Sequence, residues 1–332
     1  MPLAAALLAA CDRALPTPSN DRPSVHVTAF SPGAEPGVGR DQAIRFRFDR
    51  FLRPTTVLRQ SIYVTTGLLD PVTGESPAGG YHLEPRYDPY ERMAVFALPP
   101  GGRWSPEMRH TVRLRPPADE GDVAGIRAFD GASLAEATTY TFETSGGVTD
   151  PSHDVDDAWP RVDWCDEVAG PPRLPSVRKV LGVCAHAGCH GGAEPAADMG
   201  LGSVSVLREK VLGVAARGAP ETSTSGEVVT RPTVFGEGMP RVDPGSPGNS
   251  YLIYKLLIHP LNHPAPGDPE ALETSYQRGL PPLEAPEPAE LERLRDAFVT
   301  LEPMPAKGWL KPSEMRALVI WIARGAELRE CP

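Results

Sequence analysis

The first half of the chain alternates apolar and polar side chains over short runs. Alternation of this kind is typical of β-strands that bury one face. Residues 43–49 give the clearest case, because Ile44, Phe46 and Phe48 fall on the same side. Turns rich in proline and glycine separate the runs, so residues 24–146 predict a β-sandwich. The expected strands span residues 25–28, 43–49, 61–65, 81–85, 92–98, 110–114 and 139–144.

Apolar residues recur at helical spacing in the second half. Residues 175–183 predict a short helix with Ser176 as its N-cap. Residues 311–326 predict a longer helix that begins at Pro312 and ends at Gly325. The apolar stripes of the two helices are Val177, Val180 and Leu181, and Met315, Leu318, Val319 and Ile322. With long loops between these elements, the second half is predicted to be mainly α.

Composition narrows the possible partners. The chain has 332 residues, a formal net charge of −10, 39 prolines and 32 glycines. The length allows two domains, and the prolines and glycines favour short elements joined by many turns. The negative charge argues against nucleic acid as a partner.

A histidine directly follows the second of two closely spaced cysteines. Cys184 and Cys189 have four residues between them, and His190 comes next. The usual haem-attachment motif has two residues between its cysteines. Two thiols can add to the two vinyl groups of a haem, and the adjacent imidazole can then bind the iron. Gly191 and Gly192 would let the backbone pass close to such a flat ligand.

Two other interpretations of this motif remain open. Cys184 and Cys189 are also suited to a local disulfide, if the chain is exported. Together with His186 and His190, the same cysteines are zinc ligands by type. We favour haem, because adjacent ligands at positions 189 and 190 would make a cramped tetrahedral site. His186 is then expected to be exposed in the spacer.

A methionine between two prolines precedes the last helix. Met304 lies in a loop, and a thioether is a suitable sixth ligand for haem iron. The helix at 175–183, the cysteine–histidine motif, the long loops, Met304-Pro305 and the terminal helix with Trp321-Ile322 together resemble the class I-like cytochrome c domain. The resemblance covers most of residues 165–332. It implies one haem c held by Cys184 and Cys189, with His190 as proximal and Met304 as distal iron ligand; Met239 is a rival distal ligand.

The first half resembles the bacterial Ig-like domain of many surface proteins. The matching pieces are Phe30-Ser31-Pro32, the 44–49 strand, the Arg53-Pro54-Thr55-Thr56 corner, residues 61–64, Tyr87-Asp88-Pro89 with Val95-Phe96, and the closing 140–144 strand. The resemblance implies a spacing or binding role, with a protein or a cell-surface polymer as the contact. His26, His82 and His110 are scattered in this half, and we expect them to be solvated.

The N-terminus resembles a bacterial lipoprotein signal. An apolar run precedes Cys11 in residues 1–11, and Cys11 would become the lipidated first residue of the mature protein. The alternative is an ordinary apolar N-terminus. Residues 12–23 are predicted to be a tether, and residues 147–164 are predicted to be an acidic linker between the two halves. The expected location is the bacterial cell envelope, in the periplasm or at the outer membrane or cell surface.

Cys165 and Cys331 enclose the second half of the chain. In an exported protein they are the natural disulfide pair, and two free thiols are the alternative.

Taken together, these features predict an exported, lipid-anchored monohaem cytochrome c with an Ig-like module. It would pass electrons to an unidentified redox protein and would not be an enzyme. The main alternative is a surface interaction protein whose second domain is haem-free and held by a disulfide. A weaker alternative is an open iron site with peroxidase-like activity.

Overall fold

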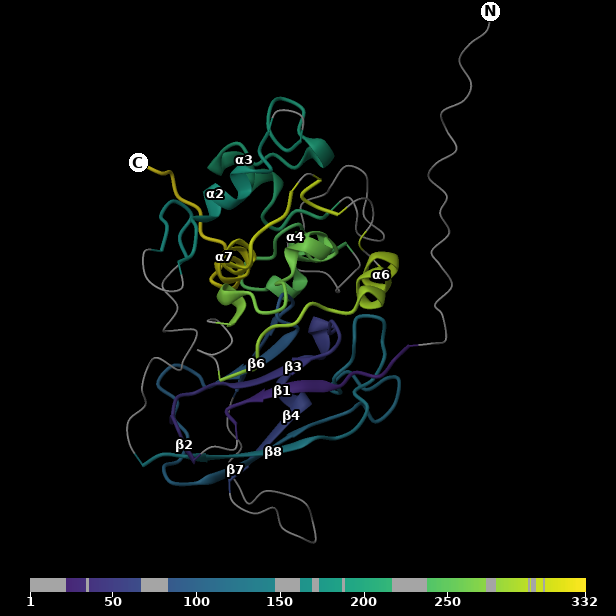
Figure 1. The fold of residues 1–332 in the computed structure, drawn as a ribbon, viewed down its shortest axis with the longest axis vertical. Helices are drawn as coiled ribbons and strands as arrows, with labels where there is room; N and C mark the ends of the chain where they lie inside the picture. The colour runs from purple at the N-terminus through teal and green to yellow at the C-terminus, as the bar shows by residue number, and fades with distance from the viewer. Residues whose placement is uncertain are drawn as a thin grey trace, which may run out of the picture.

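A computed structural model describes most of the chain. It covers residues 22–33, 36–66, 83–146, 162–168, 173–186, 189–216, 238–272, 279–297, 299, 303–306 and 308–332. An N-terminal β-sandwich of two four-stranded sheets is followed by a mainly helical region with loops, which lies over one face of the sandwich (Figure 1). The fold class predicted from the sequence is confirmed.

The sandwich has one sheet in the order β1-β3-β6-β5 and a second in the order β2-β8-β7-β4. All neighbours are antiparallel except β2 and β8, which are parallel. The strands are β1 (Val27–Ser31), β2 (Pro36–Val38), β3 (Ile44–Phe48), β4 (Ile62–Thr66), β5 (Glu84–Asp88), β6 (Met93–Ala97), β7 (Arg109–Leu114) and β8 (Thr139–Thr144), with 3-10 turns η1 (Pro54–Thr56) and η2 (Arg59–Ser61) before β4.

The alternation in the sequence identifies the inner face of the first sheet. Ile44, Phe46 and Phe48 of β3 are fully buried between the sheets. Strand β2 was not expected, because three residues centred on a glycine show no alternation. Strand β5 begins at Glu84, three residues later than expected, and the strand predicted at residues 25–28 lies at 27–31.

One histidine of the sandwich departs from expectation. His26 is exposed, but His110 is fully buried and stacks on Phe142 with ring centroids 4.9 Å apart. His110 lies on the inner face of β7, where its ring also packs against Trp104. The expectation that His110 is solvated is therefore wrong; His82 lies outside the described residues.

The helical region is built from short elements. They are α2 (Val177–Gly182), η4 (Ala196–Asp198), α3 (Val204–Lys210), η5 (Pro247–Asn249), α4 (Tyr251–Leu257), η6 (Pro260–Asn262), α6 (Pro288–Ala297) and α7 (Pro312–Ala323). Both predicted helices are present, and α2 packs against α7 although more than a hundred residues separate them. Gly325 follows α7 with a φ of 94°, the left-handed conformation that favours glycine at a helix end.

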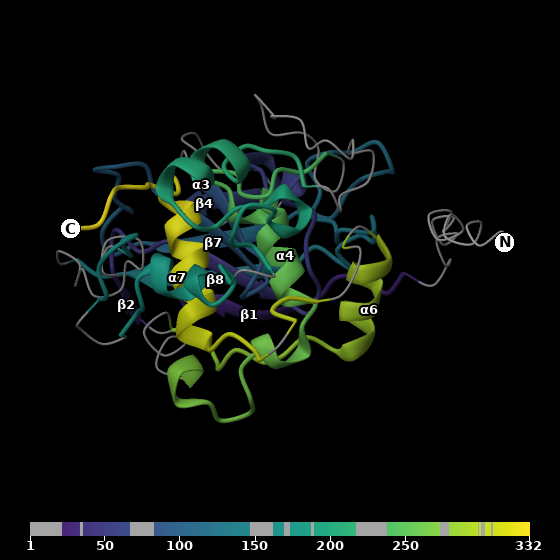
Figure 2. The ribbon, with the colours of Figure 1, turned by 90° about the horizontal axis from the view of Figure 1, so that it is seen from above.

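The sandwich and the helical region share a hydrophobic core. Phe51, Tyr90 and Phe129 of the sandwich are buried among the apolar residues of the helices. Seen from above, α4 and α7 lie across the first sheet (Figure 2). Val162 and Trp164, which we expected in a solvated linker, are also buried in this core. Val162 and Trp164 are therefore part of the shared core.

Polar residues of the first sheet are buried in the same contact. Arg45 and Arg47 alternate with the inner residues of β3 and so point away from the sandwich core, yet both are buried. Arg47 donates one hydrogen bond to the carbonyl of Pro281 (2.6 Å) and forms an ion pair with Glu91 (3.1 Å). The outer face of this sheet is thus an internal surface of the protein.

Within the part of the chain that the structure describes, no helix combines the length and apolar character needed to cross a bilayer.

Candidate haem attachment site

Helix α2 ends just before Cys184 and is held in place by its N-cap and by its buried side. The Ser176 hydroxyl accepts a hydrogen bond from the Lys179 amide, as an N-cap does, and Val177 and Leu181 are buried against the helical core. Because α2 also packs on α7, the start of the cysteine motif is anchored to the last helix of the chain.

The cysteine motif folds back on itself through its backbone. The His190 amide donates to the Cys184 carbonyl (3.1 Å), and the amides of Cys189 and Gly191 both donate to the His186 carbonyl (2.9 Å each). These bonds bring the two ends of the motif together in a turn. The four-residue spacer therefore brings the backbone of His190 directly beside Cys184.

Gly191 is required by this turn. A Cβ atom at position 191 would lie 2.2 Å from the Ala185 carbonyl oxygen, closer than any side chain tolerates. From the sequence, we expected this glycine to let a flat ligand approach the backbone. In the structure, the close neighbour is the spacer's own backbone.

The imidazole of His190 is held in one orientation. Its side chain is largely buried (7% exposed), and Nδ1 lies 3.1 Å from the Ala196 carbonyl oxygen. A carbonyl only accepts, so Nδ1 carries the proton of this hydrogen bond. Burial lowers the pKa of His190, although hydrogen bonds with the Ala196 and Met199 carbonyls act in the opposite direction. The net lowering of the pKa favours the neutral ring. A neutral ring protonated at Nδ1 presents its lone pair at Nε2, as metal-binding histidines do.

Both thiols of the motif are free in the structure. Cys184 is half-buried at the edge of the helical core, and burial raises the pKa of its thiol; Cys189 is exposed. The local disulfide considered above is therefore not formed. His186 is exposed, as expected. Among the described residues, no three His, Cys, Asp or Glu side chains gather closely enough to hold a metal ion, so the zinc interpretation gains no support.

The two candidate methionines occupy different environments. Met304 is half-buried and packs against the outside of the helical core, whereas Met239 is fully buried within that core. The Met304 amide donates to the Lys255 carbonyl (3.3 Å) at the end of α4. A thioether at the edge of the core can turn toward a ligand without opening a cavity, but Met239 cannot. The environment thus favours Met304 as a ligand.

These side chains have the donor types that a covalently bound haem requires. Two free thiols lie on either side of a turn, the imidazole has a fixed tautomer, and a half-buried thioether is available in a later loop. Cys184, Cys189, His190 and Met304 are the residues that would hold the group.

Cys165 and Cys331 form a disulfide. Their Cα atoms lie 5.4 Å apart, and both side chains pack against the helical core. The bond joins residues 166 positions apart and ties the C-terminal tail to the start of the helical region. A disulfide of this kind indicates an extracytoplasmic location. Cys11 and most of the expected acidic linker lie outside the described residues.

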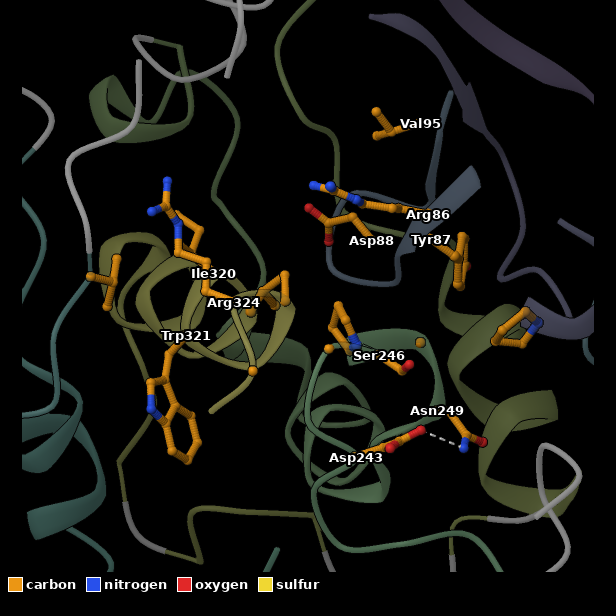
Figure 3. Close-up of a pocket in the computed structure, with 18 of the residues that line it drawn as sticks. Arg86, Tyr87, Asp88, Val95, Asp243, Ser246, Asn249, Ile320, Trp321 and Arg324 are labelled. Atoms are coloured by element: carbon orange, nitrogen blue, oxygen red, sulfur yellow. Dashed lines mark hydrogen bonds between the residues drawn. The ribbon is translucent and has the colours of Figure 1, made fainter. Parts of the chain in front are cut away.

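A cleft opens between the sandwich and the helical region (Figure 3). Its volume is about 1240 Å³, and its walls come from β5 and β6 on one side and from η5 and the end of α7 on the other. Arg86 and Asp88 lie on the strand side, and Ile320 and Arg324 on the helix side. The residues expected to hold haem do not line it. No local signal in the sequence pointed to this cleft, because its walls come from segments that lie far apart along the chain.

A buried carboxylate stabilises one wall of the cleft. Asp243 accepts a hydrogen bond from the Asn249 amide group (2.9 Å), and its backbone amide donates to the Ser250 hydroxyl (2.8 Å). Burial raises the pKa of Asp243, although hydrogen bonds from Asn249 and Ser246 act in the opposite direction. The carboxyl group orders the turn at η5 that faces the sandwich.

No family model matches the chain, and no curated protein matches it. Among solved structures, it is similar to domains 1–6 of the surface layer protein SbsC, with 11% identity and a TM-score of 0.26 over 38% of this chain but only 14% of that one. It is also similar to PcoC, a methionine-rich copper resistance protein from Escherichia coli (14% identity, TM-score 0.26, 37% of this chain and 100% of that one). CopC from Methylosinus trichosporium OB3b gives 17% identity and a TM-score of 0.23 over 36% of this chain and 93% of that one. Such low scores carry no argument on function.

Proposed function

We propose that the chain is an exported c-type cytochrome that holds one haem covalently through Cys184 and Cys189 and transfers single electrons. The observation that carries the proposal is the largely buried His190, which directly follows Cys189 and whose Nδ1 donates to the Ala196 carbonyl; Nε2 would be the atom that binds iron. When bound, the haem would supply reversible one-electron chemistry.

The rest of the site supports electron transfer over catalysis. Met304 would be the second protein ligand of the iron, and an iron whose ligands all come from the haem and the protein would exchange electrons without binding a substrate. The helical core shields the side of the motif that carries Cys184, whereas Cys189 faces solvent. A redox partner of as yet unspecified identity would approach the exposed side.

The proposed location is the bacterial cell envelope. The disulfide is consistent with an oxidising compartment, and Cys11 would provide a lipid anchor to the membrane. The Ig-like sandwich would then act as a rigid base for the helical region, because the two share a buried core.

Haem content tests the proposal directly. The full chain is expressed in a host with cytochrome c maturation, denatured, extracted with acid–acetone and measured as a pyridine haemochrome. We expect about one haem per chain to stay attached, and none in the Cys184→Ser/Cys189→Ser variant. The Cys165→Ser/Cys331→Ser variant is the matched control, since it also loses two cysteines but keeps the motif. A colourless wild-type protein would refute the proposal.

The same measurement decides the alternative, a haem-free surface interaction protein. The cleft between the sandwich and the helical region favours that function, because ligand sites often lie where two regions of a protein meet. If the chain lacks haem, the cleft becomes the site to probe.

A further inference from the structure

Asn262 is a fully buried amide side chain at the end of η6. None of its surface is exposed. A buried amide needs hydrogen-bond partners, and those of Asn262 are three backbone groups on two segments, the end of α4 and the loop 303–310. Its sequence position, between His259-Pro260 and His263-Pro264, gave no indication of this role.

The side-chain amide nitrogen of Asn262 links Met304 to helix α4. Nδ2 donates to the Met304 carbonyl (3.0 Å) and to the Leu256 carbonyl in the last turn of α4 (2.8 Å). The Met304 amide donates to the Lys255 carbonyl in the same turn. Both backbone groups of Met304 are therefore attached to the C-terminal end of α4, one directly and one through Asn262.

The amide oxygen of Asn262 binds the other end of the same loop. Oδ1 accepts a hydrogen bond from the Leu310 amide (2.7 Å), and Leu310 is buried just before α7 begins. One side chain thus fixes two points of the loop 303–310, six residues apart, and joins both to α4. A loop held at both ends restricts where the Met304 thioether can lie.

We infer that Asn262 positions Met304 as the sixth iron ligand by holding the loop 303–310 at both of its ends. This inference rests on the proposed haem function. The hydrogen bonds reach the backbone of the loop, so Asn262 is a positioning residue and does not touch the iron. Its loss leaves the cysteines and His190 untouched and loosens the methionine side of the site only.

The test compares Asn262→Ala and Asn262→Asp with wild type after maturation. Asn262→Asp keeps an acceptor for the Leu310 amide but loses the donor to Met304. Asn249→Ala is the matched control. The side-chain amide of Asn249 also donates a hydrogen bond, to Asp243, but it does not contact the loop 303–310. Met304→Ala removes the thioether itself and so shows the largest loss of methionine ligation that any variant can produce.

Two readouts are taken on each protein with attached haem. The first is the far-red charge-transfer band that ferric haem shows when a thioether is its axial ligand. The second is the affinity for added imidazole, which competes with the methionine. We expect Asn262→Ala to weaken the band and to raise the imidazole affinity about tenfold. The reason is that the loop loses its hydrogen bonds to the Asn262 side chain at Met304 and Leu310. Asn262→Asp should weaken the band at least as much, because a buried carboxylate would face the Met304 and Leu256 carbonyl oxygens, and Asn249→Ala should match wild type.

A third readout needs no haem. In the unmatured chain, hydrogen exchange at the amides of Met304 and Leu310 should accelerate about tenfold in Asn262→Ala, while amides in α7 stay protected.

The possible failures are distinguishable. A wild-type chain that attaches no haem overturns the proposed function and this inference with it. A wild-type chain that attaches haem but lacks the thioether band, or an Asn262→Ala variant with unchanged band and imidazole affinity, overturns the inference alone.

Discussion

Arg47 of the sandwich and Arg316 of α7 share the carboxylate of Glu91. Arg47 lies 3.1 Å from one carboxylate oxygen, Arg316 bonds the other, and all three side chains are buried. Arg316 also pairs with Asp88 (3.3 Å) and lies over the ring of Tyr90. The helical region is therefore joined to the sandwich by charge as well as by apolar packing.

Glu91→Gln should destabilise the protein by about 3–5 kcal/mol, because it leaves two guanidinium groups buried with one carboxylate fewer. Glu84→Gln is the control, since Glu84 and Arg86 form an exposed pair 3.9 Å apart, and we expect it to cost less than about 1 kcal/mol. Urea unfolding of both variants measures the difference. Equal stability of the two variants would contradict the buried network.

Gly191→Ala should destabilise the chain by about 3 kcal/mol and reduce haem attachment, because the added Cβ would overlap the Ala185 carbonyl. Gly182→Ala, at the end of α2, is the matched control: a Cβ there meets nothing, and alanine favours a helix more than glycine does. Denaturant unfolding and haem content are measured on both. The turn would be disproved by a Gly191→Ala variant as stable as Gly182→Ala.

Removing the disulfide with Cys165→Ser/Cys331→Ser should lower the free energy of unfolding by up to about 5 kcal/mol. The physical reason is that the crosslink closes a loop of 166 residues and so restricts the unfolded chain. Both double variants are compared with wild type in the chain without haem, where Cys184→Ser/Cys189→Ser removes two thiols but no crosslink, and we expect a loss of about 1 kcal/mol. Comparable losses in the two variants would be inconsistent with a stabilising disulfide.

His263 should make stability depend on pH between about 4 and 6.5. Its Nε2 donates to the Leu257 carbonyl (2.7 Å), and burial lowers the pKa of His263 to about 4. In the unfolded chain the same group titrates near 6.5, so the unfolded state binds the proton first as the pH falls. The native state therefore loses stability below pH 6.5, by up to about 3 kcal/mol, and the loss levels off near pH 4.

His263→Gln keeps a hydrogen-bond donor and should remove this part of the pH dependence, measured as the difference from wild type by unfolding at several pH values. Replacement of the exposed His26 by glutamine should leave the pH dependence as it is in wild type. A His263→Gln protein whose stability varies with pH as wild type does would show that His263 is not the responsible group.

Local patterns were enough to predict seven of the eight described strands and the helices α2 and α7, but not β2, α3, α4 or α6. Ile44, Phe46 and Phe48 alternate because a strand places every second side chain on one face, and the structure buries these three between the sheets. Ser176 and Gly325 mark helix ends through hydrogen bonding and backbone conformation within a few residues. The cysteine–histidine motif is also local, so its ligand types could be recognised without any knowledge of the fold.

The tertiary structure alone decided which polar residues are internal. Arg47 and Arg316 follow the expected pattern for solvated positions on a strand and a helix, yet each is buried against a partner from a distant part of the chain. The link between Asn262 and Met304 is of the same kind, because it joins residues 42 positions apart. Periodicity, helix caps and motif chemistry depend on neighbours along the chain, so the order of amino acids is enough to predict them. The burial of charge, the cleft and the attachment of the methionine loop depend on how segments meet in space, and no local pattern encodes that meeting.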